Sequence, residues 1–321
     1  MSDIKTDWFI IVNPRAGSGK TISGWTEAEG LLRRRGVPFT VEFTHYQSHA
    51  RERALQAARD GYRLLLAAGG DGSVHEMFSG ILDFCTETGT PAEEFRLGNI
   101  PIGSGNDWLK SIGVPHDIGK VVDLVADGSF RFQDVIQVRN SDGNTCCMAN
   151  VGGTGFDSHV CVRVNARKER GHRSRWIYVG ALIMTILKLK RIKVEIIGDG
   201  QIVYKGPCFS IAFGNGRYSG GGMLQAAGAV MDDGLVDVMV VPVMSILRIL
   251  REVHCLIDGT TPQSPSLVYR QCRKITVMPL DPRYADLFEV DGEIEGRLPM
   301  EIAATGQRIG VVAPATPEPR A

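Results

Sequence analysis

The residues with the clearest chemical potential lie at 69–73, where glycines flank an aspartate and a serine after an apolar run. Glycine lets main-chain N–H groups approach a ligand without a Cβ, and a helix start carries partial positive charge, so this turn suits a phosphate. Asp71 would repel a phosphate directly. It fits if a divalent cation lies between the two groups, or if it handles a proton. An ordinary strand-to-helix turn with an acidic cap is the alternative.

Two further glycine-rich turns also follow apolar runs. One covers 13–20, where Lys20 could be a charge partner for a phosphate, and the other covers 103–107. Pro14 stands where a Walker A motif needs glycine. Ile22 and Trp108 stand where the last glycine of a G-x-G-x-x-G motif belongs. The sequence therefore disfavours P-loop and Rossmann dinucleotide sites and leaves a generic phosphate-facing turn.

Strands and helices are expected to alternate in the first part of the chain. The apolar runs predict buried strands at 8–12, 39–44, 63–68 and 97–102, and the apolar spacing predicts helices at 23–35, 48–59 and after Gly72. This alternation indicates an open parallel α/β sheet with helices on both faces, whose ligands bind at the carboxyl ends of the strands. All three turns would open on that edge, which is a stronger signal than any one turn.

The second part of the chain has closely spaced strands instead. They are expected at 130–138, 145–151, 192–197, 202–213, 235–241, 275–278 and 286–290. Turn signals at 142–143 and 198–200 predict hairpins. We therefore expect a mainly antiparallel β-sandwich domain with a helical insertion at 157–190 and a short helix near 245–254. The predicted boundaries are 1–134 for the α/β domain, with a strand at 305–314 returning to it, and 135–304 for the β-rich domain.

Composition narrows the class of protein. The 321 residues include 36 Lys and Arg and 36 Asp and Glu, so net charge gives no reason to expect a nucleic-acid partner. Residues 1–5 lack the apolar run of a signal peptide, and the best apolar segment, 177–187, is shorter than the ~20 residues that span a bilayer. The seven cysteines form no C-x-x-C pair, which indicates reduced thiols. We expect a cytoplasmic protein.

Five motifs occur in a fixed order along nearly the whole chain. They are NPRAG at 13–17, GGDGS at 69–73, PIGSGND at 101–107, a glycine-rich segment at 214–222 followed by DDG at 232–234, and DGE at 291–293. In this order and spacing the chain resembles the diacylglycerol kinase catalytic domain superfamily, especially its soluble bacterial lipid kinases of the YegS type. Ser73 and Ser104 replace threonines of the family pattern but keep a hydroxyl. His75 stands where bacterial members often have asparagine, a departure shared by the sphingosine and ceramide kinase branches.

The resemblance implies ATP- and Mg²⁺-dependent transfer of the γ-phosphate of ATP to a lipid hydroxyl, first of all that of diacylglycerol, giving phosphatidic acid. Phosphoryl transfer asks mainly for positioning and charge neutralisation. The 1–134 domain would bind ATP, the 135–304 domain would bind the lipid, and the active site would lie between them. A sphingoid-base or ceramide kinase, an NAD kinase and a nucleotide-binding regulator without catalysis remain alternatives. NAD kinase shares the GGDG turn, but NPxxG and the late DGE fit the lipid kinases better.

The resemblance also implies roles for individual residues. The backbone N–H groups of Gly70, Gly72 and Ser73 would hold phosphates. The other nucleotide contacts implied are Asn13, Gly17, Ser18, Gly19, Lys20, Gly103, Ser104, Gly105, Asn106 and Glu293.

Acidic residues would supply the metal site and the base. Asp71 and Asp107 could hold Mg²⁺ directly or through water, and Asp134 matches another acidic position near the metal. Asp291 would take the proton of the lipid hydroxyl, with Glu293 beside it. In the sphingosine kinase branch the equivalent of Asp71 has that role, so the choice of base stays open. Without the resemblance, 291–293 would be read as an exposed hairpin turn.

Two other segments have a possible ligand role. The segment Val230–Leu235 resembles the family's structural cation loop, in which the Asp233 carboxylate and the carbonyls of Val230 and Leu235 would bind Mg²⁺; a plain type I turn is the alternative. A basic cluster in the helical insertion comprises Arg163, Arg167, Lys168, Arg170, Arg173 and Arg175. It is either a solvated helix face or a surface that docks peripherally on anionic lipids at the inner membrane face. A homodimer is also left open.

Overall fold

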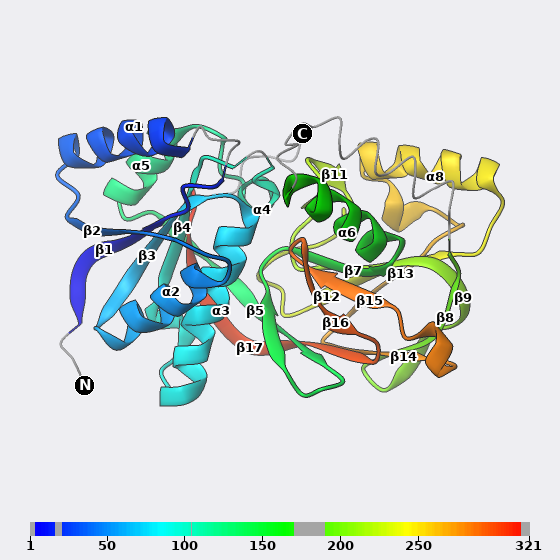
Figure 1. Ribbon diagram of the computed structural model, residues 1–321. Helices are drawn as coiled ribbons and strands as arrows, with labels where there is room; N and C mark the ends of the chain where they lie inside the picture. Colours follow the sequence, from blue (N-terminus) through cyan, green and yellow to red (C-terminus); the bar gives the residue numbers. More distant parts are fainter. Residues whose placement is uncertain (1–3, 17–20, 104, 170–189, 316–321) are drawn as a thin grey trace. The chain divides into compact units, whose positions relative to one another are not determined.

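The computed structural model describes residues 4–16, 21–103, 105–169 and 190–315. The chain divides into two compact units (Figure 1). Unit 1 comprises Met1–Val135 and Gly306–Ala321, and unit 2 comprises Ile136–Thr305. The strands β5 (Phe130–Asn140) and β17 (Met300–Val312) contribute residues to both units.

Unit 1 is built on a parallel sheet. Its strand order is β2-β1-β3-β4-β17, and each neighbouring pair is parallel. Its first four strands are β1 (Lys5–Val12), β2 (Phe39–Phe43), β3 (Tyr62–Gly69) and β4 (Arg96–Pro101). The central strands are apolar on both faces because helices cover both faces; Ile10, Ile11 and Leu65 are inaccessible to solvent. The predicted open parallel α/β fold is confirmed.

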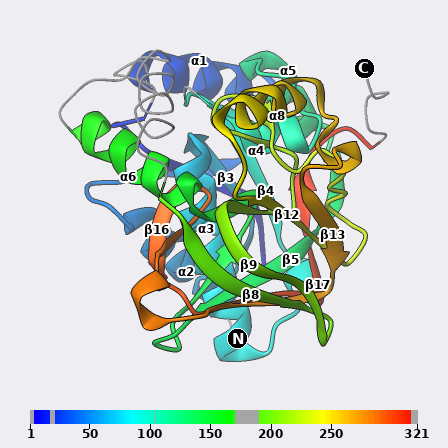
Figure 2. The ribbon, with the colours of Figure 1, turned by 90° about the vertical axis from the view of Figure 1, so that its right-hand side faces the viewer.

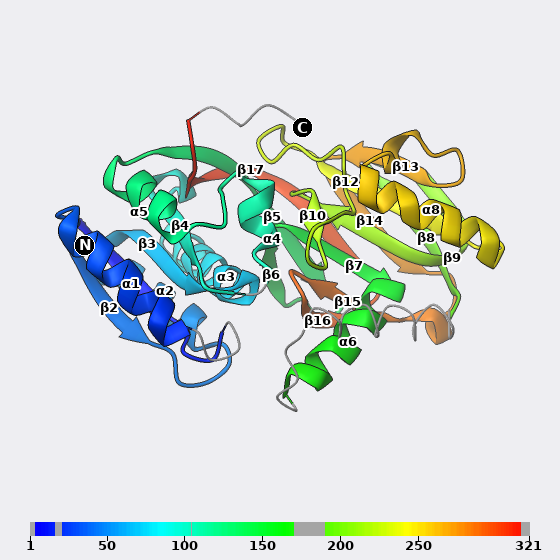
Figure 3. The ribbon, with the colours of Figure 1, turned by 90° about the horizontal axis from the view of Figure 1, so that it is seen from above.

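Helices cover the unit 1 sheet in two pairs. The pair α1 (Thr21–Arg34) and α5 (Ile118–Ala126) packs together on the side that faces the viewer in Figure 3. The pair α2 (His49–Arg59) and α3 (Asp71–Thr88) packs together on the other face. The short helices α4 (Asp107–Ser111), α5 and η2 (Ala92–Glu94) were not expected from the sequence. A capping signal for α5 was present, since the Asp117 carboxylate accepts the Lys120 N–H at 2.9 Å.

Unit 2 is mainly antiparallel, as predicted. Its strands are β6 (Thr145–Met148), β7 (Val151–Gly155), β8 (Ile192–Gly198), β9 (Gln201–Gly214), β10 (Tyr218–Ser219), β11 (Met223–Leu224), β12 (Val236–Pro242), β13 (Val268–Cys272), β14 (Lys274–Pro279), β15 (Leu287–Val290) and β16 (Glu293–Arg297), joined by the first part of β17. Its helices are α6 (Phe156–Glu169), α8 (Ile246–Asp258), η3 (Thr261–Gln263) and η4 (Pro282–Tyr284). The expected helical insertion begins with α6, and its residues 170–189 lie outside the described part of the chain.

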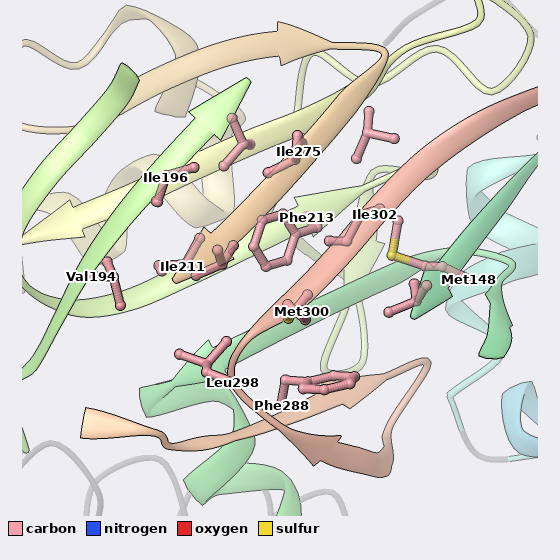
Figure 4. Packing of buried hydrophobic residues seen from close by; sticks show 14 of the residues in the cluster. Met148, Val194, Ile196, Ile211, Phe213, Ile275, Phe288, Leu298, Met300 and Ile302 are labelled. Carbon is pink, nitrogen blue, oxygen red and sulfur yellow. The ribbon is translucent and has the colours of Figure 1, made fainter. Parts of the chain in front are cut away.

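The core of unit 2 lies between strands that alternate inward and outward residues. In β8, Ile192, Val194 and Ile196 are buried while Lys193 between them is exposed. Phe213, Ile275 and Ile302 meet the β8 side chains from other strands and are fully buried (Figure 4). The two-residue period therefore places one apolar face of each strand in this core.

Three differences from the expected strands have a physical reason. The single strand expected at 145–151 is two strands, because Ala149 and Asn150 interrupt the ladder and direct their N–H groups to another turn. The strands β13 and β16 were not expected. Each lies at the end of a strand path and buries few side chains, so neither has an alternating apolar pattern to detect.

Candidate active site

The three glycine-rich turns of unit 1 meet at the carboxyl edge of its sheet. Asn13, directly after β1, donates its side-chain N–H to the Ser73 hydroxyl at 3.2 Å. Gly103, after β4, donates its backbone N–H to the Gly69 carbonyl at 3.0 Å. These two contacts join the turns after β1, β3 and β4. Of the predicted nucleotide contacts, five lie outside the described residues: Gly17, Ser18, Gly19, Lys20 and Ser104.

The meeting point is also the topological switch point of the sheet. The chain leaves β1 toward β2 on one side and returns to β3 on the other side of β1. In open α/β sheets, ligands bind at the carboxyl ends of the two strands where the direction reverses. Asn13 follows one of these strands and Gly70 follows the other. The topology therefore selects the same place as the motifs.

The turns after β3 and β4 touch through their backbones. A Cβ at Gly103 would lie 2.5 Å from the Cα of Gly70 and 2.9 Å from the Asn106 side-chain oxygen. Real Cβ atoms do not approach a backbone carbon so closely, so this position needs glycine. The close approach keeps the start of α3 beside the 103–106 turn.

The start of α3 suits an anion. Gly70 is its N-cap and provides no side-chain cap, and Gly72 in the first turn has no intrahelical acceptor for its N–H. Ser73 is buried and donates its backbone N–H to the Gly70 carbonyl at 3.0 Å, which leaves its hydroxyl to Asn13. Uncapped N–H groups at the positive end of a helix dipole form an anion site.

Asp71 has a structural partner in addition to its predicted role. Its Oδ1 accepts the backbone N–H of Trp108 at 3.0 Å and so caps α4. Its Oδ2 faces Gly105, where an added Cβ would lie 3.0 Å away. The alternative prediction for this turn was an acidic helix cap. Such a cap is present, but it caps α4 and not α3. One oxygen of Asp71 is used for capping, and the metal and base roles stay predictions.

Asn106 holds the turn after β4 in an unusual backbone conformation. Its φ of 52° lies in the left-handed region, where asparagine is among the better-tolerated residues. The side chain donates to the Gly103 carbonyl at 2.9 Å and to His116 Nε2 at 2.7 Å. Its Oδ1 is buried and has no hydrogen-bond partner among the residues that the structure describes. An unpaired buried oxygen costs free energy, so this atom is suited to a ligand, a water or a cation.

The predicted metal carboxylates are near this region but form no closed cluster. Asp107 is buried and its Oδ1 contacts Lys110 Nζ at 2.7 Å; Asp134 is buried on β5. Across residues 4–16, 21–103, 105–169 and 190–315, no three His, Cys, Asp or Glu side chains group as a metal site. Mg²⁺ typically takes one or two carboxylates and completes its shell with water and phosphate oxygens. The oxygen donors of Asp71, Asp107 and Asn106 are of that kind.

Two residues that brace this edge were not predicted from the sequence, the buried Gln133 and the exposed His116. Gln133 on β5 accepts the Trp108 indole N–H at 2.9 Å, which ties α4 to the strand that carries Asp134. His116 supports Asn106 as described above. Neither residue lies in a glycine-rich motif, and only the adjacency of Gln133 to Asp134 could have pointed to it.

In unit 2, Asp291 and Gly292 form the tight turn between β15 and β16. Their φ angles of 52° and 89° are those of a two-residue hairpin turn, for which Asp-Gly is a preferred pair. The hairpin reading made without the resemblance is therefore correct as local structure. It does not exclude a functional role.

The carboxylate of Asp291 accepts hydrogen bonds from the break between β6 and β7. Its Oδ2 accepts the Ala149 N–H at 2.8 Å, and its Oδ1 accepts those of Asn150 at 2.8 Å and Val151 at 3.2 Å. A carboxylate has about four acceptor directions, so these bonds occupy most of its capacity and fix its orientation.

Asn150 connects the Asp291 turn to the glycine-rich segment at 214–222. Its carbonyl accepts the N–H groups of Asn215 and Gly216 at 2.9 and 2.8 Å, and its side chain donates to the Tyr218 carbonyl at 2.7 Å. Two of the sequence motifs, 214–222 and 291–293, are thus hydrogen-bonded through a residue that belongs to neither. Glu293 begins β16 two residues after Asp291 and is half-buried.

The predicted cation loop at Val230–Leu235 is a turn closed by its own aspartate. Asp233 Oδ1 accepts the Leu235 N–H at 3.0 Å. Partial burial and the negative charge of Asp232 raise the pKa of Asp233. A bound cation would oppose both effects, so the loop is compatible with either alternative, and the Mg²⁺ role stays a prediction.

A buried acid in unit 2 was missed by the sequence analysis. Asp157, in the first turn of α6, accepts hydrogen bonds from the Ser210 hydroxyl and from Gln225. Burial raises its pKa to about 6 and outweighs both hydrogen bonds. Nothing local marks it, because Asp in a first helical turn is common at the surface as well.

The predicted basic cluster is only partly described. Arg163 lies on α6, and the other predicted cations lie outside the residues whose side chains are described.

Comparison with known proteins covers both units. Residues 7–138 match the family model "Diacylglycerol kinase catalytic domain", and residues 150–313 match the model "YegS C-terminal NAD kinase beta sandwich-like domain". No helix among the described residues is long and apolar enough to cross a membrane.

Individual relatives agree with the family models. A protein of Mycobacterium tuberculosis named "Diacylglycerol kinase" is 29% identical over 313 residues, which cover 95% of this chain and 94% of the relative. A "Probable lipid kinase YegS-like" of Xanthomonas campestris is 27% identical over 243 residues, 74% of each chain. A crystal structure of a diacylglycerol kinase from Bacillus anthracis has a TM-score of 0.69 at 19% identity and covers 96% of each chain, which shows the shared fold.

Proposed function

Because the chain belongs to the diacylglycerol kinase family with a YegS-type C-terminal domain, and is therefore a kinase, we propose that it transfers the γ-phosphate of ATP to the free hydroxyl of diacylglycerol. The product is phosphatidic acid. The relative named "Diacylglycerol kinase" supports this acceptor, since it matches over nearly the full length of both chains. The acceptor stays in a bilayer through its acyl chains, so on this proposal the enzyme works peripherally at the inner membrane face.

The observation that carries the proposal is the convergence of three turns at the switch point. Asn13 contacts Ser73, and Gly103 contacts Gly69, so the uncapped start of α3 faces the place where a polyphosphate is expected. Backbone N–H donors bind phosphate oxygens without adding a side-chain charge. This is the arrangement that phosphoryl transfer requires on the donor side, where positioning supplies most of the rate.

The reaction needs one bond made and one broken at the γ-phosphorus. The acceptor oxygen bonds to phosphorus as the bond to the β–γ bridging oxygen breaks, and ADP leaves with that oxygen. The proton of the acceptor hydroxyl passes to a carboxylate, for which we assign Asp291 with Glu293 beside it. Three backbone N–H donors hold the Asp291 carboxylate in a fixed direction, which is the property that supports this assignment.

The residues present fit a bound Mg²⁺. Asp71, Asp107 and the Asn106 oxygen, which has no partner within the described part of the chain, would hold it, with water and phosphate oxygens completing the shell. When bound, the ion neutralises charge on the β- and γ-phosphates.

An acceptor screen tests the proposal. The purified full chain is incubated with ATP and Mg²⁺ and with diacylglycerol, sphingosine or ceramide in mixed micelles, or with NAD, and both ADP and the phosphorylated product are measured. We expect kcat/KM for diacylglycerol to exceed those of the other acceptors at least tenfold, and chelation of Mg²⁺ to abolish turnover. Transfer only to a sphingoid base, to ceramide or to NAD would replace diacylglycerol as the acceptor in this proposal. Sphingosine and ceramide are included because His75 stands where bacterial members of the family often have asparagine.

A further inference from the structure

Helix α8 of unit 2 carries two of the most exposed large apolar side chains in the described part of the chain. Leu247 is 77% exposed and Ile257 is 68% exposed, whereas Ile249 on the inner side of the same helix is 9% exposed. A single exposed leucine is ordinary on a protein surface. Two large apolar side chains that are mostly exposed on one 13-residue helix indicate a surface that contacts another partner.

The inner side of α8 is fixed to unit 2, so the exposure is a property of the folded helix. Glu252 is buried, and its Oε2 accepts the Ser264 hydroxyl at 2.6 Å. The helix ends at Gly259, whose φ is 77° and whose N–H donates to the Cys255 carbonyl at 3.0 Å. Rotation of α8 to hide Leu247 would break the buried contact of Glu252.

The exposed side combines apolar anchors with positive charge. Leu247 and Ile257 are ten residues apart, about 15 Å along the axis and roughly 80° around it. Arg248 and Arg251 are both exposed beside them, and the acidic residue of the exposed side, Asp258, lies at the C-terminal end. Apolar side chains with adjacent arginines are typical of helices that lie in the interface of an anionic bilayer.

We propose that the α8 face, formed by Leu247, Arg248, Arg251 and Ile257, docks unit 2 on the surface of an anionic lipid bilayer. The inference rests on the proposed function, because an enzyme that phosphorylates a membrane lipid must reach an acceptor whose acyl chains remain in the bilayer. The leucine and isoleucine enter the acyl boundary, and the two arginines pair with anionic headgroups.

The position of α8 is consistent with delivery of a lipid to the Asp291 turn. Figures 1 and 2 draw α6 and α8 on the upper side of unit 2. α6 contacts the turn directly, since the Cys161 thiol donates to the Gly292 carbonyl at 2.9 Å. The docking helix and the helix that supports the candidate base therefore lie on one side of the same unit.

Vesicle binding by the full chain tests the docking face. With phosphatidylcholine vesicles containing phosphatidylglycerol, the variant Leu247→Gln/Ile257→Gln should bind about tenfold or more weakly, because two apolar side chains no longer leave water. The variant Arg248→Gln/Arg251→Gln should lose about fivefold per arginine at low salt on these vesicles and nothing on phosphatidylcholine alone.

Matched controls come from the other side of unit 2. Ile202, 62% exposed in the β8–β9 hairpin, and Arg283, exposed on η4 beside β14, receive the same substitutions. Figure 1 draws β14 on the lower side of the unit, away from α8. Ile202→Gln and Arg283→Gln should bind vesicles like the unchanged protein.

Activity separates this inference from the proposed function. The α8 variants should phosphorylate a short-chain, water-soluble diacylglycerol at the normal rate and vesicle-borne diacylglycerol more slowly. Unchanged vesicle binding in both α8 variants overturns the inference. If these variants also change from dimer to monomer in sedimentation while their vesicle binding is unchanged, the α8 face is a contact between two copies of the chain and not a membrane surface. Normal vesicle binding by a chain that phosphorylates no lipid would instead refute the proposed function and leave the docking face standing.

Discussion

Two aspartate-containing turns, one in each unit, use backbone N–H groups in opposite ways. The 69–73 turn leaves the N–H groups at the start of α3 without a side-chain cap, and its aspartate accepts an N–H from a different helix, α4. The 291–292 turn does the reverse, since its aspartate takes up three N–H groups from one segment of chain. The first turn is open to an anion from outside. The second supplies its own anion.

The difference indicates a division of labour in the proposed reaction. A phosphate chain needs several donors that wait for it, and the cost of leaving them unpaired is recovered when the ligand binds. A proton acceptor needs a fixed direction, and three donors to the Asp291 carboxylate provide it. In the first turn a Cβ at Gly69 would overlap the Ser73 side chain, and in the second Gly292 has a left-handed backbone that glycine adopts readily.

The largest expected effect is at Asp291. Asp291→Asn should lower kcat by about 10²–10⁴-fold and leave the KM for ATP within about threefold, because the variant loses the proton acceptor but not the phosphate turns. The asparagine NH₂ would face one of the backbone donors, so the free energy of unfolding should also fall by about 1–3 kcal/mol. Single-turnover kinetics and thermal unfolding separate the two effects.

Glu293→Gln is the matched control for the Asp291 variant. In this variant Asp291 keeps all three of its backbone N–H donors, so the free energy of unfolding should stay near that of the unchanged protein. If Asp291→Asn retains near-normal turnover while Glu293→Gln loses it, Glu293 is the base and Asp291 is a structural anchor.

The next effect is at the contact between the turns after β3 and β4. Gly103→Ala places a methyl group 2.5 Å from the Gly70 Cα, and backbone cannot yield as a side chain would. A displacement of the turns should cost about 10²-fold in kcat/KM for ATP. Nucleotide binding measured by calorimetry should weaken in parallel.

Gly30→Ala on α1 is the control for that substitution. A Cβ there meets nothing closer than the Arg34 guanidinium at 3.4 Å, and alanine favours helix by up to about 1 kcal/mol. It should leave ATP kinetics unchanged and slightly raise the melting temperature. Normal ATP kinetics in Gly103→Ala would contradict the role given to the contact between the turns.

A smaller effect distinguishes the two roles of Asp71. Asp71→Asn retains an oxygen for the Trp108 N–H but loses the charge, whereas Asp71→Ala loses both. Both should raise the Mg²⁺ concentration needed for half-maximal activity. Only the alanine variant should also lose about 0.5–2 kcal/mol of unfolding free energy, the usual cost of a removed helix cap. An unchanged Mg²⁺ requirement in Asp71→Asn would leave capping as the only role of this side chain.

The smallest effect is a pH dependence from Asp157. Its folded-state pKa of about 6 lies above the unfolded value, so the protonated form is favoured in the fold. The stabilisation is complete below about pH 4 and is lost as pH rises through about 6. The free energy of unfolding, measured with denaturant at pH 5 and at pH 8, should fall between these pH values in the unchanged chain. In Asp157→Asn this fall should be smaller by about 1–3 kcal/mol.

Asp281→Asn is the control, since hydrogen bonds and ion pairing with Arg283 lower the pKa of Asp281 to about 2, and its contribution changes only in strong acid. Asp281→Asn should follow the unchanged chain between pH 5 and pH 8. An equal pH dependence in Asp157→Asn would place the titration elsewhere.

Local signals were sufficient for most of the fold. The buried strands β1 and β3 contain continuous apolar runs at 8–12 and 64–68, and β4 is apolar apart from Arg96 and Asn99. All three were predicted to within three residues because burial on both faces leaves few polar positions. The Asp199-Gly200 hairpin was found because both residues take a positive φ that Asp-Gly tolerates. Weakly buried edge strands such as β13 had no such signal.

The candidate site was only partly predictable, because its defining contacts are not local. Asp71 caps a helix 37 positions later, and Asp291 accepts from residues about 140 positions earlier. A single sequence shows that Asp71 and Asp291 lie in turns, and the motif order places them in a family. It does not show which N–H group each carboxylate will meet, since that depends on how strands far apart in the chain are paired.

The strand β17 has a consequence for synthesis of the chain. β4 pairs with β3 on one edge and, on its other edge, with Gly310 and Val311 of β17, which lie about 210 positions later in the sequence. Until the ribosome has released those residues, β4 is an open edge that can pair with another nascent chain. About 210 residues separate the two strands, which at synthesis speeds of roughly 5–20 residues per second is a wait of roughly 10–40 seconds. The first four strands of this sheet are therefore made long before its last strand, and the ribosome-bound chain has an exposed strand edge at which it can associate with other chains.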